Sequence, residues 1–262
     1  MIRVGIGGWT CEPWRGVFYP KGLPQARELE HASRKLTTIE INGTFYGTQK
    51  PTSFQRWFAE TPDDFVFTLK GPRFATNRRV LAEAGESIER FFGSGVLELK
   101  QKLGPVFWQM PPTKQFNPDD FAGFLSLLPA RLEGHPIRHA VEVRHESFVT
   151  PDFIALLRKH AVAPVLVESN KHPMIADVTS DFIYARLQDT SEEIKTGYAP
   201  AALDAWAKRA QTWEKGGAPD DLVTVADKAA RSKGKRDVFI FMISGAKVRA
   251  PAAAMALIER LR

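Results

Sequence analysis

Short runs of β-branched and aromatic residues recur along the chain, and a longer amphipathic or polar stretch follows each of them. Such short runs are typical of strands, and the amphipathic stretches are typical of helices. We predict strands at residues 4–8, 38–42, 65–70, 106–109, 140–144, 164–168, 182–187 and 237–244. We predict helices at residues 25–36, 53–60, 86–103, 118–128, 152–160, 200–214 and 251–261.

A strand followed by a helix, repeated eight times, is the pattern of a closed barrel, whereas a doubly wound sheet usually has about five or six strands. The length of 262 residues also fits a barrel, because such barrels typically contain about 250 residues. The sequence therefore predicts an α/β fold, a single TIM-type (β/α)8 barrel that forms one domain over residues 1–262.

Residues that commonly start helices precede three of the predicted helices. Thr52, Asn117 and Thr150 each precede a predicted helix, and proline follows the last two of them, as is common at the first turn of a helix.

Two connections between predicted strands are irregular. Residues 171–180 are expected to form a loop. Residues 216–236 are polar and basic, and we expect them to form a solvated helix and loop inserted before the last strand.

The composition is that of a soluble globular protein, with 44% hydrophobic and 25% charged residues and a mean hydropathy of −0.24. It excludes disordered, collagen-like and coiled-coil chains. No apolar run approaches the roughly 18 residues that span a bilayer, so no membrane partner is expected. The first residues, MIRVGIGGW, lack a basic leader followed by a long apolar stretch. We therefore expect no signal peptide and a cytoplasmic location.

The cysteine content limits the possible disulfides and metal sites, and the net charge indicates which binding partners are plausible. The single cysteine, Cys11, excludes an intramolecular disulfide and a metal site with several cysteines. A formal net charge of +6 and an isoelectric point near 9.4 make an anionic partner plausible, and nucleic acid is one such partner.

Polar residues gather near the predicted strand ends, which is where the chemistry of barrel enzymes takes place. They are Glu40, Asn42, Lys70, Gln109, Glu142, Arg144, Glu168, Arg186 and Ser244. A buried charge is costly unless it is paired, and five predicted strands carry at least one. Two interpretations follow: a polar cup that binds and transforms a polar, anionic substrate, or a structural ion network at the top of the barrel.

Three of these residues are candidate catalytic groups. Glu142 and Glu40 are acid or base candidates, because a carboxylate without a cationic partner becomes a general acid and one beside a cation stays ionised. Lys70 is a candidate general base, Schiff-base nucleophile or electrostatic clamp, and the clamp requires the least tuning of its pKa. Arg144 and Arg186 are candidate clamps for an anion.

Further candidate ligand contacts lie in the loops. Trp9, at the end of the first strand, and Tyr46 belong to an early group of aromatic residues that either stack a sugar or base or simply pack loops against the barrel. Ser244 and Lys247 flank small residues before the last helix, an arrangement that suits a phosphate group but is equally an ordinary helix start.

The sequence predicts no metal site. Of six histidines, only His145 and His172 are candidates for the rim of the barrel. Glu40, Glu142 and Glu168 leave an oxygen-rich magnesium or manganese site open, but the interleaved lysine and arginine residues argue against it. No cofactor is identified.

Five segments carry a resemblance to a known family. They are GGWTCEPWRGVFYP, IEINGTFYGTQKPTSFQRWFAETPDDFVFTLKGPR, PVFWQMPP, AVEVRHESF and GYAPAALDAW. In this order they resemble the domain of unknown function 72 family, also called YecE-like. The resemblance implies a TIM-type barrel. It implies no established reaction. It also implies a distant likeness, at the level of the fold alone, to the endonuclease IV and xylose isomerase barrels.

The resemblance also bears on individual positions. Those that match the family pattern are Trp9, Glu40, Asn42, Thr44, Phe45, Tyr46, Lys70, Gln109, Glu142, Arg144 and Arg186. The chain departs from the pattern at Gln188 and Asp189, where a His-Gly pair is expected, and at residues 242–244, where Phe-Asn-Asn is expected.

Three hypotheses for function remain. The leading one is an enzyme that acts on a small polar or phosphorylated substrate at the C-terminal rim. The second is a barrel that binds or processes nucleic acid, and the third is a non-catalytic protein that binds a ligand in the cup. The first requires Glu40, Lys70, Glu142 and Arg186 to lie together.

Overall fold

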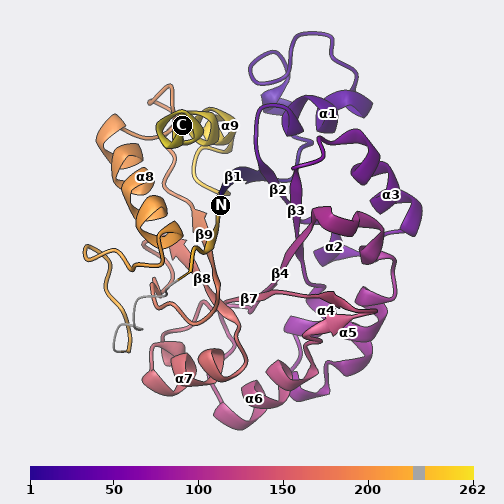
Figure 1. Ribbon diagram of the computed structural model, residues 1–262, viewed down its shortest axis with the longest axis vertical. Helices are drawn as coiled ribbons and strands as arrows, with labels where there is room; N and C mark the ends of the chain where they lie inside the picture. The colour runs from indigo at the N-terminus through magenta and orange to yellow at the C-terminus, as the bar shows by residue number, and fades with distance from the viewer. Residues whose placement is uncertain (227–233) are drawn as a thin grey trace.

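Eight parallel strands close into a barrel, and helices cover its outside (Figure 1). This computed structural model describes residues 1–226 and 234–262. Around the barrel the strands follow the order β1, β10, β9, β8, β7, β4, β3, β2. Their bounds are β1 Ile2–Gly7, β2 Thr38–Ile41, β3 Val66–Lys70, β4 Leu103–Gln109, β7 His139–Glu142, β8 Ala163–Glu168, β9 Phe182–Leu187 and β10 Asp237–Met242. The predicted TIM-type barrel and all eight predicted strands are confirmed, with strand ends that differ from the prediction by three residues at most.

The helices that return the chain between strands also agree largely with the prediction. Their bounds are α1 Glu28–Ser33, α3 Pro51–Glu60, α5 Gly85–Phe92, α6 Pro118–Leu127, α7 Pro151–Lys159, α8 Pro200–Glu214 and α9 Ala250–Leu261. Asn117 and Thr150 cap their helices by accepting hydrogen bonds from the backbone N–H groups of Asp120 and Phe153. Thr52 is not a cap, because α3 already begins at Pro51.

The prediction of one helix over residues 86–103 is wrong. Helix α5 ends at Phe92, and a 3-10 helix, Val96–Lys102, leads directly into β4. Between them Gly95 has a φ of 98°, and a Cβ there would lie 2.8 Å from Pro51. Only glycine adopts this conformation readily, so the chain turns here. The predicted helix over 25–36 is likewise shorter, because residues Gln25–Arg27 are a 3-10 turn.

Short elements in the loops escaped prediction. They are α2 Gly43–Tyr46, α4 Arg73–Thr76, a hairpin of β5 Arg131–Leu132 and β6 His135–Pro136, and 3-10 helices at Glu12–Trp14, Leu81–Glu83, Glu146–Phe148 and Lys247–Arg249. Residues 171–180 form the expected loop. Of the expected insertion at 216–236, residues 227–233 lie outside the described part of the chain.

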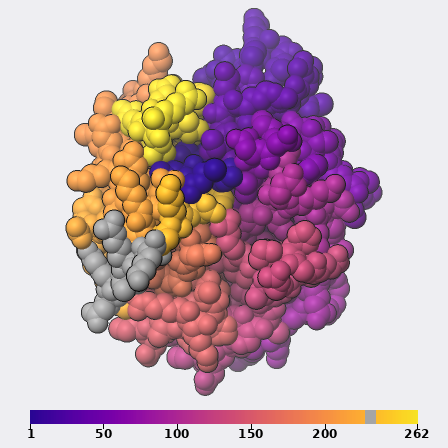
Figure 2. All heavy atoms as spheres, in the orientation of Figure 1, coloured from indigo at the N-terminus to yellow at the C-terminus, as the bar shows by residue number. Residues whose placement is uncertain are grey.

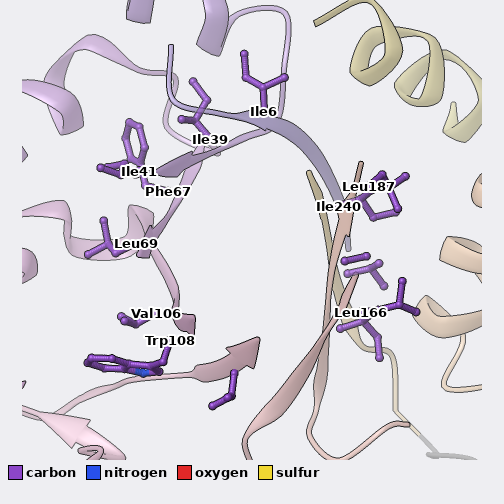
Figure 3. Packing of buried hydrophobic residues seen from close by; sticks show 14 of the residues in the cluster. Ile6, Ile39, Ile41, Phe67, Leu69, Val106, Trp108, Leu166, Leu187 and Ile240 are labelled. Atoms are coloured by element: carbon purple, nitrogen blue, oxygen red, sulfur yellow. The ribbon is translucent and has the colours of Figure 1, made fainter. Parts of the chain in front are cut away.

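Alternating side chains of the strands build two apolar layers. One set points outward and packs under the helices, and it includes Ile6, Ile39, Leu69, Trp108 and Ile240 (Figure 3). The other set fills the inside of the barrel and consists of Val66, Phe107, Ala140, Ala163, Val165, Val167, Phe182, Tyr184, Phe239 and Phe241. The barrel interior is therefore a packed core, as is usual for this fold.

The first residues of the chain lie near the middle of the face shown in the space-filling view (Figure 2). That face therefore holds the amino end of β1, which starts at Ile2. The carboxyl ends of the strands point the other way. In the described residues, no helix is long and apolar enough to cross a membrane.

His139 makes folding stability sensitive to acid. Its Nδ1 accepts a hydrogen bond from Trp108 Nε1 (3.2 Å), so the proton resides on Nε2, which donates to the carbonyl of Pro129 (2.9 Å). Burial lowers the pKa of His139 from 6.5 to about 4. Between these values the unfolded chain binds a proton that the folded chain does not, so stability decreases as the pH falls.

We expect the free energy of unfolding to decrease by on the order of 3 kcal/mol between pH 6.5 and pH 4 through this residue alone. Unfolding by urea across this range should show a shallower pH dependence for His139→Gln than for the wild type. His135→Gln, at an exposed histidine of the β5–β6 hairpin, is the control. An identical pH dependence in wild type and His139→Gln would contradict the assignment.

Candidate functional site

A layer of polar side chains closes the carboxyl end of the barrel interior. Strand register places Glu40 level with Thr68, Gln109 level with Glu142, and Arg186 level with Phe241. Glu40 and Glu142 are fully buried, whereas 3% of Arg186 and 7% of Lys70 are exposed. This layer lies above the apolar residues that fill the rest of the interior, so any ligand must reach it from the open rim.

Arg186 lies at the centre of this layer. Its Nε and Nη2 donate to the two carboxylate oxygens of Glu40 (3.1 Å each), and its Nη1 donates to Glu142 Oε2. The guanidinium carbon also lies 4.9 Å from the centroid of the Phe107 ring. Burial alone would lower the pKa of Arg186, but the two carboxylates raise it above its usual value. Arg186 is therefore a permanent cation shared by two buried carboxylates.

Glu40 receives two further donors besides Arg186. The hydroxyl of Tyr184 donates to its Oε2 (2.8 Å), and Asn42 Nδ2 donates to its Oε1 (3.0 Å). Burial and the charge of Glu40 raise the pKa of Tyr184 well above its usual value, so this hydroxyl keeps its proton. Thr68 Oγ1 lies 2.9 Å from the same hydroxyl. Both oxygens of Glu40 are thus occupied by donors.

Glu142 is held in the same way. Its Oε1 accepts from Gln109 Nε2 (2.7 Å) and from Arg144 Nε (2.8 Å), in addition to the contact of Oε2 with Arg186. Burial would raise the pKa of Glu142, but the charges of Arg186 and Arg144 lower it below its usual value. Glu142 is consequently ionised at neutral pH and has no proton to donate.

Lys70 is bound differently from the two arginines. Its Nζ donates to the neutral amide oxygen Oε1 of Gln109 (2.8 Å) and lies 4.0 Å from the centroid of the Phe45 ring. Burial, and secondarily the charge of Arg186, lowers the pKa of Lys70 to about 8. Within residues 1–226 and 234–262, no carboxylate forms an ion pair with this ammonium.

Together these side chains form one hydrogen-bonded group, which we call the mouth network. It consists of Glu40, Asn42, Thr68, Lys70, Gln109, Glu142, Arg144, Tyr184 and Arg186. Three cations face two carboxylates, so the network has one positive charge in excess. Arg186 contacts both carboxylates. Arg144, whose side chain is 23% exposed, contacts Glu142, and Lys70 contacts Gln109 instead of a carboxylate.

The structure brings seven of the candidate residues into the mouth network, and Trp9 lies beside it. Trp9 packs edge-on against Trp57, with ring centroids 5.3 Å apart. Trp9 and Asn42 line one cavity of about 230 Å³. The network also contains Thr68 and Tyr184, which share strand faces with Lys70 and Arg186. Alternation along the strand is the signal that points to them.

Three candidate residues make no described hydrogen bond or ion pair to the mouth network. Tyr46 is 65% exposed, and its ring packs perpendicular to that of Phe45, with centroids 5.1 Å apart. Ser244 accepts a hydrogen bond at its carbonyl from Thr190 Oγ1 (2.8 Å). Lys247 lies over the ring of Trp14, whose Nε1 donates to the Lys247 carbonyl (2.8 Å).

The loop between β10 and α9 is covered by another loop. The N–H of Ala246 donates to the carbonyl of Thr190 (2.9 Å), and Arg249 Nε donates to the carbonyl of Glu192 (2.9 Å). Gly245, with a φ of 74°, packs against the carbonyls of Gln188 and Thr190. The segment after β9 therefore rests on the segment after β10. Gln188 and Ser244, at which we expect a departure from the family pattern, lie in these two segments.

The rim carboxylate Glu168 stands apart from the mouth network. Its oxygens accept from the Tyr198 hydroxyl and from Trp206 Nε1 (3.0 Å), and this ties α8 to the end of β8. Among the side chains that the structure describes, no group of three or more His, Cys, Asp or Glu residues is arranged to hold a metal ion.

Comparisons with known proteins agree with this fold. A protein of Bacillus subtilis, the UPF0759 protein YunF, is 25% identical over 158 residues, which cover 58% of this chain and 54% of YunF. The match thus spans about half the length of that relative. The crystal structure of a DUF72 family protein of Thermotoga maritima superposes with a TM-score of 0.74, at 23% identity, and covers 100% of this chain and 99% of that one.

A more distant structure, a fusion of a xylose isomerase-like TIM barrel with 4-hydroxyphenylpyruvate dioxygenase, matches with a TM-score of 0.52 at 15% identity. It covers 98% of this chain and 43% of that one. This supports a likeness of fold alone. The family model described as "Protein of unknown function DUF72" matches residues 3–262. The chain therefore belongs to the DUF72 family.

Proposed function

We propose that this protein is an enzyme acting on a small anionic substrate, such as a phosphorylated compound, at the carboxyl end of the barrel. Lys70 and Arg144 contact the anion in this proposal. The observation that carries it is the position of Lys70, a residue that is 7% exposed and whose ammonium is hydrogen-bonded to the neutral Gln109 amide. No carboxylate among the described residues forms an ion pair with this ammonium, and a negatively charged ligand would supply that partner.

A purely structural role explains the network less well. Burying an ammonium group costs several kcal/mol unless a carboxylate or several hydrogen-bond acceptors compensate it. Lys102 donates to three oxygens of Phe58 and Thr61, whereas Lys70 donates to the Gln109 amide oxygen. Glu40 and Glu142 are close by, yet both are committed to arginine. A network that served stability alone would be neutral, or would be replaced by apolar side chains as in the lower part of the barrel.

The arrangement suits a reaction in which negative charge develops on a substrate oxygen. Fixed cations in a site with little water stabilise such charge without having to reorganise. The lowered pKa of Lys70, about 8, also lets this amine exchange a proton near neutral pH. We infer that Glu40 and Glu142 are positioning residues, which orient Arg186, Asn42 and Gln109. Of the three candidate catalytic groups, Lys70 is the one that acts on the substrate.

Nucleic acid is the second candidate ligand, and one surface favours it. Phe74 is 61% exposed and lies 5.4 Å from the guanidinium carbon of Arg73. It lines a cavity of about 310 Å³ together with Arg78 and Arg90. Exposed aromatic rings among arginines can stack bases and contact phosphates.

Thermal stabilisation by a panel of compounds separates these ligand classes. We expect sugar phosphates or inorganic phosphate to stabilise the protein, by about 2.7 kcal/mol at 100 times the dissociation constant. Short single-stranded and duplex DNA should have little effect at 150 mM salt. Stabilisation by DNA alone, with a steep decrease as salt is raised, would support the nucleic-acid function instead.

Lys70→Met tests the role of the ammonium. We expect phosphate affinity to fall at least tenfold, or about 1.4 kcal/mol, while the free energy of unfolding stays equal or increases because a buried charge is removed. Calorimetric titration and urea unfolding measure the two effects.

Lys102→Met is the matched control, because Lys102 is 1% exposed and donates to the carbonyls of Phe58 and Thr61 (2.7 and 2.8 Å). It should destabilise the protein by about 1–3 kcal/mol and leave phosphate affinity unchanged. Unchanged phosphate binding by Lys70→Met would refute the proposed anion contact.

The pH dependence of anion binding gives an independent test. Sulfate keeps a constant charge from pH 6.5 to 9.5, so only the protein titrates. Lys70 faces Arg186, Glu40, Glu142 and Arg144. Loss of its proton above its pKa of about 8 removes the positive charge, so sulfate affinity should decrease above pH 8. The affinity of Lys70→Met should not change over this range, and a wild-type affinity that is constant from pH 6.5 to 9.5 would exclude Lys70 as the contact.

A further inference from the structure

We propose that the cavity beside the mouth network binds the neutral, hydroxylated part of the substrate, so that the substrate class is sugar phosphates. This rests on the proposed function, because the anionic group of such a compound lies at Lys70. The sugar then lies in the cavity that Trp9 and Asn42 share.

All side chains that line this cavity are neutral. They are Trp9, Thr10, Ile41, Asn42, Gln49 and Trp57, with backbone of two glycines between them. The volume of about 230 Å³ is smaller than the roughly 300–1,000 Å³ of sites for drug-sized ligands. The cavity therefore suits a small, uncharged portion of a ligand.

The two tryptophans give the cavity an apolar corner. Their ring planes meet at 76°, with centroids 5.3 Å apart, so they do not form the parallel slot that would hold a planar base between two faces. A sugar presents C–H groups on one side and hydroxyls on the other. It can thus pack against an aromatic ring while its hydroxyls face polar groups.

The polar groups of the cavity match the needs of hydroxyls. A hydroxyl both donates and accepts hydrogen bonds, and an amide side chain offers both functions. Asn42 uses Nδ2 on Glu40, and its Oδ1 accepts no hydrogen bond from the described residues. Gln49 makes a single long contact, from Nε2 to the Gly47 carbonyl (3.4 Å). Both amides are therefore available to a ligand.

The cavity and the anion position are adjacent. Ile41 pairs with Leu69 in the β2–β3 register, so the next residues, Asn42 and Lys70, follow side by side at the rim. Gly7 of β1 leaves the space beside the Asn42 amide and the Glu40 carboxylate free of a side chain. A Cβ there would come within 3.0 Å of Asn42 Nδ2, so glycine lets Asn42 line the cavity and reach Glu40 at the same time.

Comparing ligands with and without a sugar tests this inference. We would measure the dissociation constants of inorganic phosphate, glucose 6-phosphate and ribose 5-phosphate by calorimetric titration. At least one sugar phosphate should bind tenfold or more tightly than inorganic phosphate. Gln49→Leu should remove most of that advantage and leave the affinity for inorganic phosphate unchanged.

Two further variants complete the experiment. Gln101→Leu, at an exposed position of the 3-10 helix Val96–Lys102, is the matched control and should bind all three compounds like the wild type. Thr10→Val changes an exposed residue of the cavity wall. It should also weaken binding of the sugar phosphate alone, which keeps the test informative if Gln49→Leu folds poorly.

The outcomes separate the inference from the proposed function. If inorganic phosphate binds and neither sugar phosphate binds more tightly, the inference is wrong and the anion site stands. The inference is also wrong if sugar phosphates bind more tightly but Gln49→Leu and Thr10→Val retain the full advantage. If none of the three compounds binds the wild type, the proposed anion site itself fails.

Discussion

The bridge from Arg186 to Glu40 and Glu142 is the interaction on which the carboxyl end of the barrel depends. Glu40 stands on β2 and Glu142 on β7, and Arg186 reaches both from β9. Without this cation, the buried Glu40 would have no cationic partner and the buried Glu142 would have Arg144 alone, at a cost of several kcal/mol. The bridge also fixes the orientation of the amides and hydroxyls that share the carboxylates, so that the whole mouth network is preorganised before any ligand arrives.

Tyr184 joins the two halves of the barrel interior. Its ring packs against Phe107 and Phe241, at centroid distances of 5.3 and 5.0 Å, while its hydroxyl donates to Glu40. A tyrosine suits this position because its ring is apolar and its tip is polar. The apolar layers below it keep water away, and this strengthens every charge interaction above it.

The sequence predicts the barrel and most of the mouth network because both rest on local alternation. A polar or charged residue at every second position, as at Glu40 and Asn42 or Glu142 and Arg144, is visible without coordinates. The break at Gly95 depends on the nearby Pro51, and the places of Lys247 and Ser244 depend on contacts with Trp14 and Thr190. Such long-range contacts leave no periodic signal. The choice of Gln109 rather than a carboxylate as the partner of Lys70 depends on distances of a few ångströms.

The excess charge at Lys70 also has a consequence for competition. A buried cation attracts small anions largely irrespective of the other groups that the anion carries, because its electric field depends mainly on distance and charge. If the anion site is as proposed, inorganic phosphate or chloride occupies it in the resting protein, and each turnover begins with an exchange of anions. The neutral groups near Lys70 must then distinguish the substrate from inorganic anions. The apparent affinity for the substrate varies with the anions in the buffer.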